Sequence, residues 1–599
     1  MSTRSPVIEE RHEAHGLDHP AGSTRKLVRV PLATLLGVVV IYGVTLALLP
    51  ADGFWINDNG SKFILLDSII RSDYRDFSID WPGAVLDPHF DYNPLPVPFG
   101  RVVGDRLFSS FSPFFPLVAS FPYRAIGSTG LYVLPLLGGL LTLPAVWLLA
   151  GMLLPEGRSR RIAQPLAVGI SALGTPMWFY SVTFWEHTPA VCLTTWSVLF
   201  GARYVVSGVR REIAIAGALC GAAIFFRDEL YLFAAVLAGV SIFARRSPAD
   251  GASFALGFLP IAALLWWFQS ATLGSAIGHH LTSLAPFEGG LRDVLAGRWI
   301  AARNLLLASH RDLAVSLAIT LPFLALWIAC PRVSRRTFLW LVPAAAGVAV
   351  ACGLVVIEGH ASAPSPLRWL LASGGLFATT PALILAFVRF RGEPSSSGES
   401  SEDSSRVETA LWGVTLFYPL LYVCISPDFH SIGIHWGCRY LLSVFPVLAV
   451  LAASAIARWW VIAVGHPVFR SVILLALAVT VATQIYGLQL LYQKKQHSVG
   501  LQQIVADRPE EVIVAQGWYV PQELARVFFD KPIFSVTGAA DRSRLLPRLR
   551  AAGYDDVLLV SVPPAREEGH ADRQILSDGA LRFMTVELRN IPLRQDRTP

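Results

Sequence analysis

The stretch LYVLPLLGGLLTLPAVWLLAGML, residues 131–153, carries no charged side chain. As a helix it is long enough to cross the ~30 Å hydrocarbon core of a bilayer. Apolar blocks of comparable length recur along the chain, for example at 30–49, 313–330 and 471–491. Only helices and closed barrels satisfy their backbone inside lipid, and these blocks show no alternation of apolar and polar residues. The sequence therefore predicts an all-α polytopic membrane protein.

The composition of the whole chain agrees with this prediction. Of the 599 residues, 53% are hydrophobic and 15% are charged, and the mean hydropathy is +0.50. A soluble domain has too little interior to hide that share of apolar side chains. The formal net charge is +6, and the excess arginine falls in short loops, where it sets membrane orientation. We therefore expect membrane lipid as a partner, and no nucleic acid.

Thirteen membrane-spanning helices are predicted. Their ranges are 30–49, 131–153, 164–183, 188–206, 213–226, 230–244, 252–270, 313–330, 337–357, 369–388, 408–425, 439–457 and 471–491. Every second short loop is rich in arginine, from Arg158, Arg160 and Arg161 after the second span to Arg458 after the twelfth. Positively charged loops stay in the cytoplasm. The N-terminus is therefore expected in the cytoplasm and the C-terminus outside, in the inner (plasma) membrane of a bacterium.

This topology divides the chain into a few parts. A disordered cytoplasmic N-terminus (1–29) precedes a transmembrane domain (30–493), which an extracytoplasmic α/β domain follows (494–599). The transmembrane domain contains a first outer loop (50–130), a second outer loop (271–312) and a low-complexity cytoplasmic linker (391–407). Three prolines interrupt the apolar segment 108–126, which we expect to lie in the outer interface or to be re-entrant. In the last part, short apolar runs alternate with helical segments, which predicts a small sheet with parallel strands.

The first outer loop offers two carboxylates close to the end of the first span, Asp52 and Asp58. An amphipathic run at 62–71 follows and predicts an interfacial helix that would hold an aspartate at the outer membrane surface. The alternative is that Asp58 only caps this helix. For Lys62, Arg101 and Arg106, the alternative to a role in a site is that they are ordinary surface charges of this loop.

Further polar residues interrupt the apolar blocks on the same side. Glu186 and His187 fill the turn between the third and fourth spans, and Arg227 and Glu229 separate the fifth from the sixth. Ionisable residues at such depth are costly and are functional candidates, although a neutral cluster that only ties helices together is the alternative.

Two more signals concern the outer side. Arg439, followed by Tyr440, stands at the outer end of the twelfth span, where a guanidinium suits a lipid phosphate or merely snorkels. His279, His280 and His310 lie in the second outer loop without the spacing of metal ligands, so no metal site is assigned.

Together these residues resemble the GT-C superfamily of membrane glycosyltransferases, of the protein-mannosyltransferase and aminoarabinose-transferase type. The resemblance rests on Asp58 after the first span, on the segment SPFFPL at 112–117 ending in Ile126-Gly127, on Arg227, and on Arg439-Tyr440 with Pro446. The predicted topology of thirteen spans, a cytoplasmic N-terminus and an outer tail is the last feature on which the resemblance rests. The sequence departs from the family pattern where Asn59, and not glutamate, follows Asp58, and where no Lys-Pro precedes the apolar segment.

The resemblance implies an inverting glycosyltransferase that uses a polyprenyl-phosphate-sugar donor. Asp58, or else Asp52, would be the catalytic base. The donor phosphate would be bound by Arg439, Arg227 and Arg106, with Glu186, His187, Glu229 and Tyr440 as further site candidates. No cofactor is implied with certainty, and a divalent metal is left open, as are the sugar and the acceptor. A transporter or lipid flippase, and an O-antigen ligase or polymerase, are the alternative functions.

Overall fold

The structure is a computed structural model that describes residues 32–278, 290–306, 375–387, 402–425, 435–462, 467–562, 574–576 and 586–593. The predicted spans 313–330 and 337–357, the three histidines of the second outer loop and most of the cytoplasmic linker lie outside these residues.

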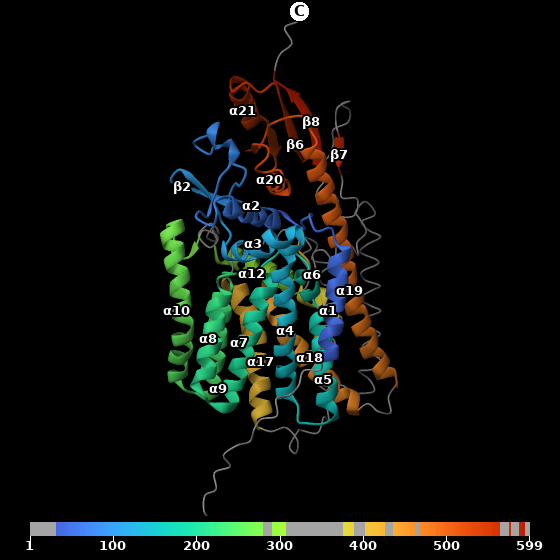
Figure 1. Cartoon of the computed structure of the whole chain (residues 1–599). Helices are drawn as coiled ribbons and strands as arrows, with labels where there is room; N and C mark the ends of the chain where they lie inside the picture. The colour runs from blue at the N-terminus through green and yellow to red at the C-terminus, as the bar shows by residue number, and fades with distance from the viewer. Residues whose placement is uncertain are drawn as a thin grey trace, which may run out of the picture.

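A bundle of upright helices forms the larger part of the molecule (Figure 1). Its helices are α1 (Leu32–Leu48), α4 (Val133–Leu153), α5 (Arg158–Leu173), α7 (His187–Ser207), α8 (Arg210–Ala223), α9 (Leu230–Arg245), α10 (Pro248–Leu273), α12 (Leu291–Leu306), α17 (Glu402–Ile425), α18 (Phe445–Ile462) and α19 (Pro467–Ala506). Most of them follow the predicted spans within a few residues. α18 is the most enclosed, and its residues from Phe445 to Ala453 are all buried.

Within the described ranges, six helical segments are long and apolar enough to cross a membrane. They are Phe114–Leu153, His187–Ser207, Pro248–Leu273, Glu402–Ile425, Arg439–Val461 and Ile473–Ala506, and the shorter apolar helices Leu32–Leu48 and Leu230–Arg245 stand beside them. One side of α1 exposes large apolar side chains such as Leu36, Val40 and Leu48, as expected for a helix that faces lipid. The chain is an integral membrane protein.

Some predicted spans are not single helices. The span at 164–183 ends as α5 before Gly174, and the short helix α6 (Met177–Ser181) follows. The described part of 369–388 is the short helix α16 (Leu376–Thr379) and the 3-10 helix η3 (Pro381–Phe387). The span at 439 opens as a 3-10 helix, η4 (Arg439–Val444), before α18. The periodicity of apolar residues predicts how long an apolar segment is, but it does not show where a helix breaks within that segment.

The first outer loop folds over one end of the bundle. It contains the helices α2 (Asn57–Arg71) and α3 (Phe114–Ile126), the 3-10 helices η1 (Pro82–Val85) and η2 (Gly127–Tyr132), and the antiparallel strands β1 (Ser78–Ile79), β2 (Gly100–Val103) and β3 (Arg106–Ser109) in the order β1-β3-β2. Figure 1 shows α2 and α3 lying across the upright helices. α3 begins after Pro113 and ends at Gly127, whose φ is +66°, so the apolar segment does not continue straight into α4.

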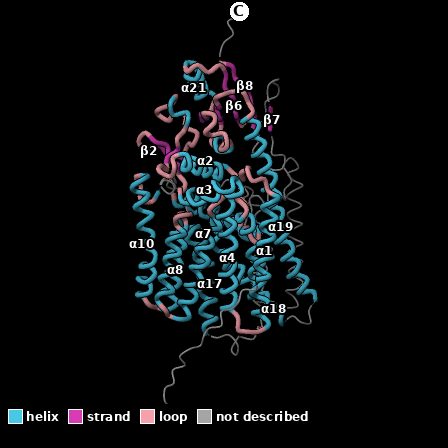
Figure 2. The backbone as a smooth tube through the Cα atoms, in the orientation of Figure 1, coloured by secondary structure: helices cyan, strands magenta, loops and turns pink. Residues whose placement is uncertain are grey.

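The end of the chain builds a five-stranded sheet in the order β5-β4-β6-β8-β7 (Figure 2). Its strands are β4 (Ile513–Gln516), β5 (Ile533–Val536), β6 (Asp556–Ser561), β7 (Gln574–Leu576) and β8 (Val586–Pro592), with helices α20 (Val520–Glu523) and α21 (Ala539–Ala551) between them. β4 pairs in parallel with β5 and β6, as the alternating pattern predicts. β8 pairs antiparallel with β6 and β7, which the sequence did not indicate.

The sheet and the first outer loop share one hydrophobic core. Trp81 packs on Phe534, with ring centroids 5.3 Å apart, and its indole N–H donates to the Ile533 carbonyl. α19 runs unbroken from the bundle into this upper part, where Lys494 pairs with Glu523 and Lys495 donates to the Tyr132 hydroxyl. The tail is therefore attached to the bundle by a continuous helix and by side-chain contacts, and not by a flexible linker.

A single glycine allows α2 to approach the tail closely. A Cβ atom on Gly60 would overlap the carbonyl oxygen of Gln522. A larger side chain at this position would push the tail away from the helix.

The arginine-rich loops that the structure describes lie at the other end of the bundle. Arg203 pairs with Glu212 across the α7–α8 turn, and Arg210 lies 3.8 Å from Asp250 at the start of α10. The outer loop covers the opposite end. This arrangement agrees with the predicted alternation of the loops.

Candidate active site

Asp58 lies in the first turn of α2 and does not cap the helix. The helix begins at Asn57 with Ile56 in the capping position, and the Asn59 side chain accepts a hydrogen bond from the Ile56 backbone N–H at 3.2 Å. Asn59 also donates to the Phe184 carbonyl at 2.8 Å and so fixes the start of α2 against the turn before α7. The capping interpretation of Asp58 is therefore wrong, and its carboxylate points to another partner.

That partner is Arg439, from the far end of the sequence. Asp58 Oδ2 accepts from Arg439 Nη1 at 2.7 Å, and the two side chains are only 13% and 12% exposed. Arg439 Nη2 donates to the Tyr440 hydroxyl at 2.9 Å, and the guanidinium lies over the Trp185 ring. Nε of this arginine is buried and has no hydrogen-bond partner among the described residues. A buried donor without an acceptor needs an explanation, and a ligand oxygen is one.

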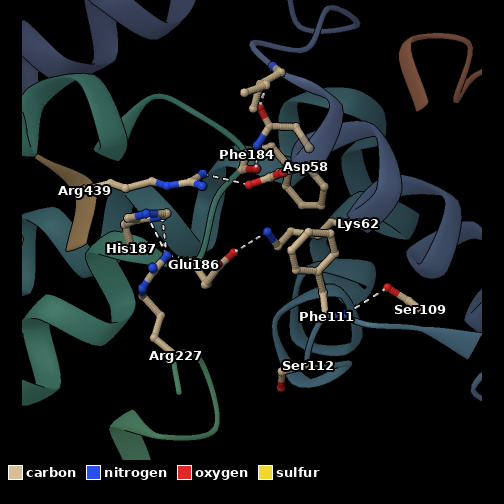
Figure 3. A network of polar contacts seen from close by, with 12 residues as sticks. Asp58, Lys62, Ser109, Phe111, Ser112, Phe184, Glu186, His187, Arg227 and Arg439 are labelled. Atoms are coloured by element: carbon tan, nitrogen blue, oxygen red, sulfur yellow. Dashed lines mark hydrogen bonds and ion pairs between the residues drawn. The ribbon is translucent and has the colours of Figure 1, made fainter. Parts of the chain in front are cut away.

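Glu186 joins two more cations to this pair. Lys62, one helical turn after Asp58 on α2, lies 3.2 Å from Glu186 Oε2, and Arg227 Nη1 lies 3.3 Å from Glu186 Oε1. Figure 3 shows Lys62, Glu186, Arg227 and His187 in a row beneath the Asp58–Arg439 pair. Lys62 and Glu186 are 3% and 8% exposed, so both charges are buried.

Arg227 sits in the loop between α8 and α9 and holds three partners. Besides Glu186, it pairs with Glu229 at the start of α9 and contacts His187 Nε2 at 2.7 Å. His187 is completely buried and stacks on Tyr180, with centroids 4.6 Å apart. Its ring therefore has a fixed orientation beside the guanidinium.

The cluster balances three carboxylates against three cations. Burial lowers the pKa of Lys62 below its ordinary value of 10.5, although Glu186 and Asp58 act in the opposite direction. Burial would also lower the pKa of Arg227, but Glu229 and Glu186 raise it above its ordinary value, so this guanidinium is a permanent charge. Such a site can bind an anionic group at Arg439 and Arg227 and can accept a proton at Asp58 or Glu186.

Two of the predicted site residues lie elsewhere. Asp52 is 63% exposed, accepts a hydrogen bond from Ser128 and forms an ion pair with Arg526 of the tail. Arg106 begins β3, the middle strand of the small antiparallel sheet, where it pairs with Asp76 and donates to Ser78 at 2.9 Å. The described contacts thus bring neither of them to the cluster.

The interpretation of Lys62 as a surface charge is wrong, because the side chain is buried in the cluster. Its spacing of four residues from Asp58 places both on one face of α2 and is the signal that could have shown it. Trp185, which the sequence places in the same turn without a role, is completely buried beneath Arg439. In the described part of the chain no three His, Cys, Asp or Glu side chains gather in a way that could hold a metal ion.

Fold and site together describe a polytopic membrane protein with a buried carboxylate–guanidinium cluster at one membrane face. No protein-family model and no curated protein matches the chain. Among solved structures, it is similar to ArnT from Cupriavidus metallidurans bound to undecaprenyl phosphate, at 14% identity and a TM-score of 0.39, over 94% of this chain and 98% of that one. ArnT in the apo state matches at 14% identity and a TM-score of 0.37, over 93% and 98%.

The archaeal oligosaccharyltransferase AglB from Archaeoglobus fulgidus, in complex with an inhibitory peptide and a dolichol-phosphate, matches at 13% identity and a TM-score of 0.45, over 88% of this chain and 69% of that one. Both ArnT, an aminoarabinose transferase, and AglB are GT-C enzymes, the class that the sequence resembles.

Proposed function

We propose that the chain is a glycosyltransferase that moves a sugar from a polyprenyl-phosphate donor to a lipid, glycan or protein acceptor at the outer membrane face. The observation that carries the proposal is Arg439. This buried guanidinium holds the carboxylate of Asp58 on one side and keeps a buried N–H without a partner among the described residues. Phosphate oxygens, like carboxylate oxygens, are acceptors that match the planar fork of a guanidinium group.

The reaction follows from these groups. An acceptor hydroxyl forms a new bond to the anomeric carbon of the sugar while the bond from that carbon to the phosphate oxygen breaks. The bonding electrons leave with the polyprenyl phosphate, and Asp58 takes the hydroxyl proton. Attack opposite to the leaving group inverts the anomeric carbon, as the resemblance implies.

Arg439 and Arg227 would stabilise the charge that grows on the phosphate as the bond breaks. Tyr440 connects them, because its hydroxyl accepts from Arg439 and its ring lies under Arg227, 5.7 Å from the guanidinium carbon. Hydrogen-bond donors that are already in position need little reorganisation during the reaction. Lys62, Glu186 and Glu229 hold Arg227 and the α2 helix in position. Arg106, bound to Asp76, keeps no role in this proposal.

The sidedness of the site belongs to the same proposal. The cluster lies at the end of the bundle that the outer loop and the tail cover, and the arginine-rich loops lie at the other end. With those loops in the cytoplasm, the cluster faces the outside of a bacterial inner membrane, where lipid-linked sugars serve as donors.

A deletion strain tests the function. Mass spectrometry of its lipid-linked sugars and of its envelope glycans should show that one donor accumulates and one sugar disappears from a glycan. Wild-type protein should restore both, and Asp58→Asn should restore neither. A deletion strain with unchanged donors and glycans would refute the proposal.

A further inference from the structure

The tail carries an exposed aromatic side chain at an unusual place in its sheet. Trp518 is 55% exposed and follows β4 by two residues. One of its faces stacks on Phe99 of the outer loop, with centroids 5.4 Å apart and planes at 8°. Phe99 is buried, so the outer loop supports the indole and holds it in one orientation.

Trp518 stands at the switch point of the parallel strands. In the order β5-β4-β6, the chain leaves β4 toward one side for β5 and returns past β4 to the other side for β6. Ligands of open α/β sheets bind outside the carboxyl ends of the two strands where this direction changes. Those ends are Gln516 and Ser561, which pair in the sheet.

The chain turns sharply after Gln516. Gly517 has a φ of +129°, and a Cβ atom there would come within 3.1 Å of Val520 and 3.2 Å of Val562. Glycine adopts such a φ at no steric cost. This turn lifts Trp518 out of the sheet and leaves its indole next to the carboxyl ends.

Two side chains with hydrogen-bonding groups meet at the carboxyl end of β4, two residues before Trp518. Arg542, in the first turn of α21, donates through Nη1 to Gln516 Oε1 at 2.8 Å, and both side chains are partly exposed. An aromatic face next to an amide and a guanidinium is a combination that suits a sugar ring. The C–H bonds of the ring pack on the negative face of the indole, and its hydroxyls bind to the polar groups.

An aromatic line leads from Trp518 to the charged cluster. Phe99 contacts Phe111, with centroids 6.2 Å apart, and the Lys62 ammonium lies 4.0 Å from the Phe111 ring centre. Lys62 in turn pairs with Glu186 of the cluster. The tail site and the cluster are thus joined by direct side-chain contacts of the outer loop.

We propose that Trp518, with Gln516 and Arg542, is a saccharide-binding subsite that holds a sugar ring of the acceptor. The assignment to the acceptor rests on the proposed function, whereas saccharide binding itself does not. An acceptor that already carries sugar residues could be held here while its end reaches the cluster. The acceptor class is therefore a glycan or a glycolipid.

The test uses the full-length protein in lipid nanodiscs, labelled with 5-fluorotryptophan. The fluorine NMR signal that is missing in Trp518→Phe identifies Trp518. Methyl glycosides of glucose, mannose, galactose and arabinose are then titrated without any donor. We expect at least one glycoside to shift this signal and to show saturation transfer from the protein.

Trp518→Leu should weaken this binding about tenfold or more, and Trp518→Phe should keep part of it, because the ring remains. Trp299→Leu is the matched control, since Trp299 on α12 is 54% exposed and far from the tail in the sequence. The signals of the other tryptophans report on folding. A Trp518 signal that no glycoside shifts, or equal binding in Trp518→Leu, overturns the subsite even if sugar transfer is established. Conversely, saccharide binding at Trp518 in a protein without transferase activity leaves the subsite standing and refutes the proposed function.

Discussion

The replacement Asp58→Asn should nearly abolish sugar transfer while the protein stays folded. Asparagine keeps an oxygen that can accept from Arg439, so the 2.7 Å contact is weakened but not lost. Exchanging a charge-assisted hydrogen bond for a neutral one costs about 1–2 kcal/mol. Loss of a general base costs about 10²–10⁴ in rate, which corresponds to roughly 3–5 kcal/mol of activation free energy.

Glu186→Gln is the matched control within the same cluster. It removes the carboxylate that stands between Lys62 and Arg227, and the side chains of all three are no more than 11% exposed. Arg227 keeps its pair with Glu229, but the buried Lys62 ammonium loses its carboxylate partner, which costs about 3–5 kcal/mol of stability. We therefore expect Glu186→Gln to lower the melting temperature more than Asp58→Asn does, and Asp58→Asn to lower the turnover of folded protein more.

The assay measures release of polyprenyl phosphate from the donor by purified protein, together with donor binding and thermal melting. Asp58→Asn should bind donor at least as tightly as wild type, because it removes a negative charge from the site. Near wild-type turnover in Asp58→Asn, with a large loss in folded Glu186→Gln, would identify Glu186 as the base and refute this assignment of Asp58.

Three further predictions concern neighbouring charges. Arg439→Lys should raise the KM for the donor about tenfold or more, because an ammonium cannot bind Asp58, Tyr440 and phosphate through a planar fork; an unchanged KM would mean that Arg439 only snorkels. The activity should fall on the alkaline side below pH 10.5, because burial lowers the pKa of Lys62 and deprotonation as the pH rises breaks its pair with Glu186. Lys62→Arg should move this alkaline loss of activity to higher pH. A pH profile identical to that of the wild type would contradict a role of the Lys62 charge. Asp52→Asn should keep turnover and lose no more than about 1 kcal/mol of stability, because its pair with Arg526 is exposed; loss of turnover in folded protein would make Asp52 the base.

Apolar blocks in the sequence predict most helices of the bundle. This works because an apolar side chain is stable in lipid or in the protein core whatever its neighbours in the fold are. α7 and α17 end within a few residues of their predicted limits. Breaks in helices are harder to predict, because they depend on tertiary contacts. At Gly174, where the helix ends, a Cβ atom would lie 2.9 Å from the Ile170 carbonyl oxygen and 3.3 Å from the Thr480 side chain of α19. The periodicity of apolar residues gives no sign of the contact with α19.

The charged residues of the site were found by a different argument. A carboxylate or guanidinium in an apolar sequence is costly, so Asp58, Glu186, Arg227 and Arg439 stand out without any knowledge of the fold. Their pairing could not be predicted, because 381 residues separate Asp58 from Arg439. Arg106 was a candidate only through the resemblance, because it precedes the apolar segment of the first outer loop. Asp76 comes next to it only when β1 and β3 pair.

The last prediction concerns Tyr440, which connects the two guanidinium groups of the cluster. Its hydroxyl accepts from Arg439 Nη2 at 2.9 Å, while its ring lies 4.9 Å from the Arg439 guanidinium carbon and 5.7 Å from that of Arg227. Tyr440→Phe keeps both ring contacts and loses one hydrogen bond, so donor affinity should fall about fivefold. Tyr440→Leu also loses the attraction of the ring for two buried cations and should weaken donor binding by a further tenfold or more. Isothermal titration with a polyprenyl phosphate measures both variants. Equal affinities in the two variants would mean that the ring only fills space and that the two arginines bind the phosphate independently of it.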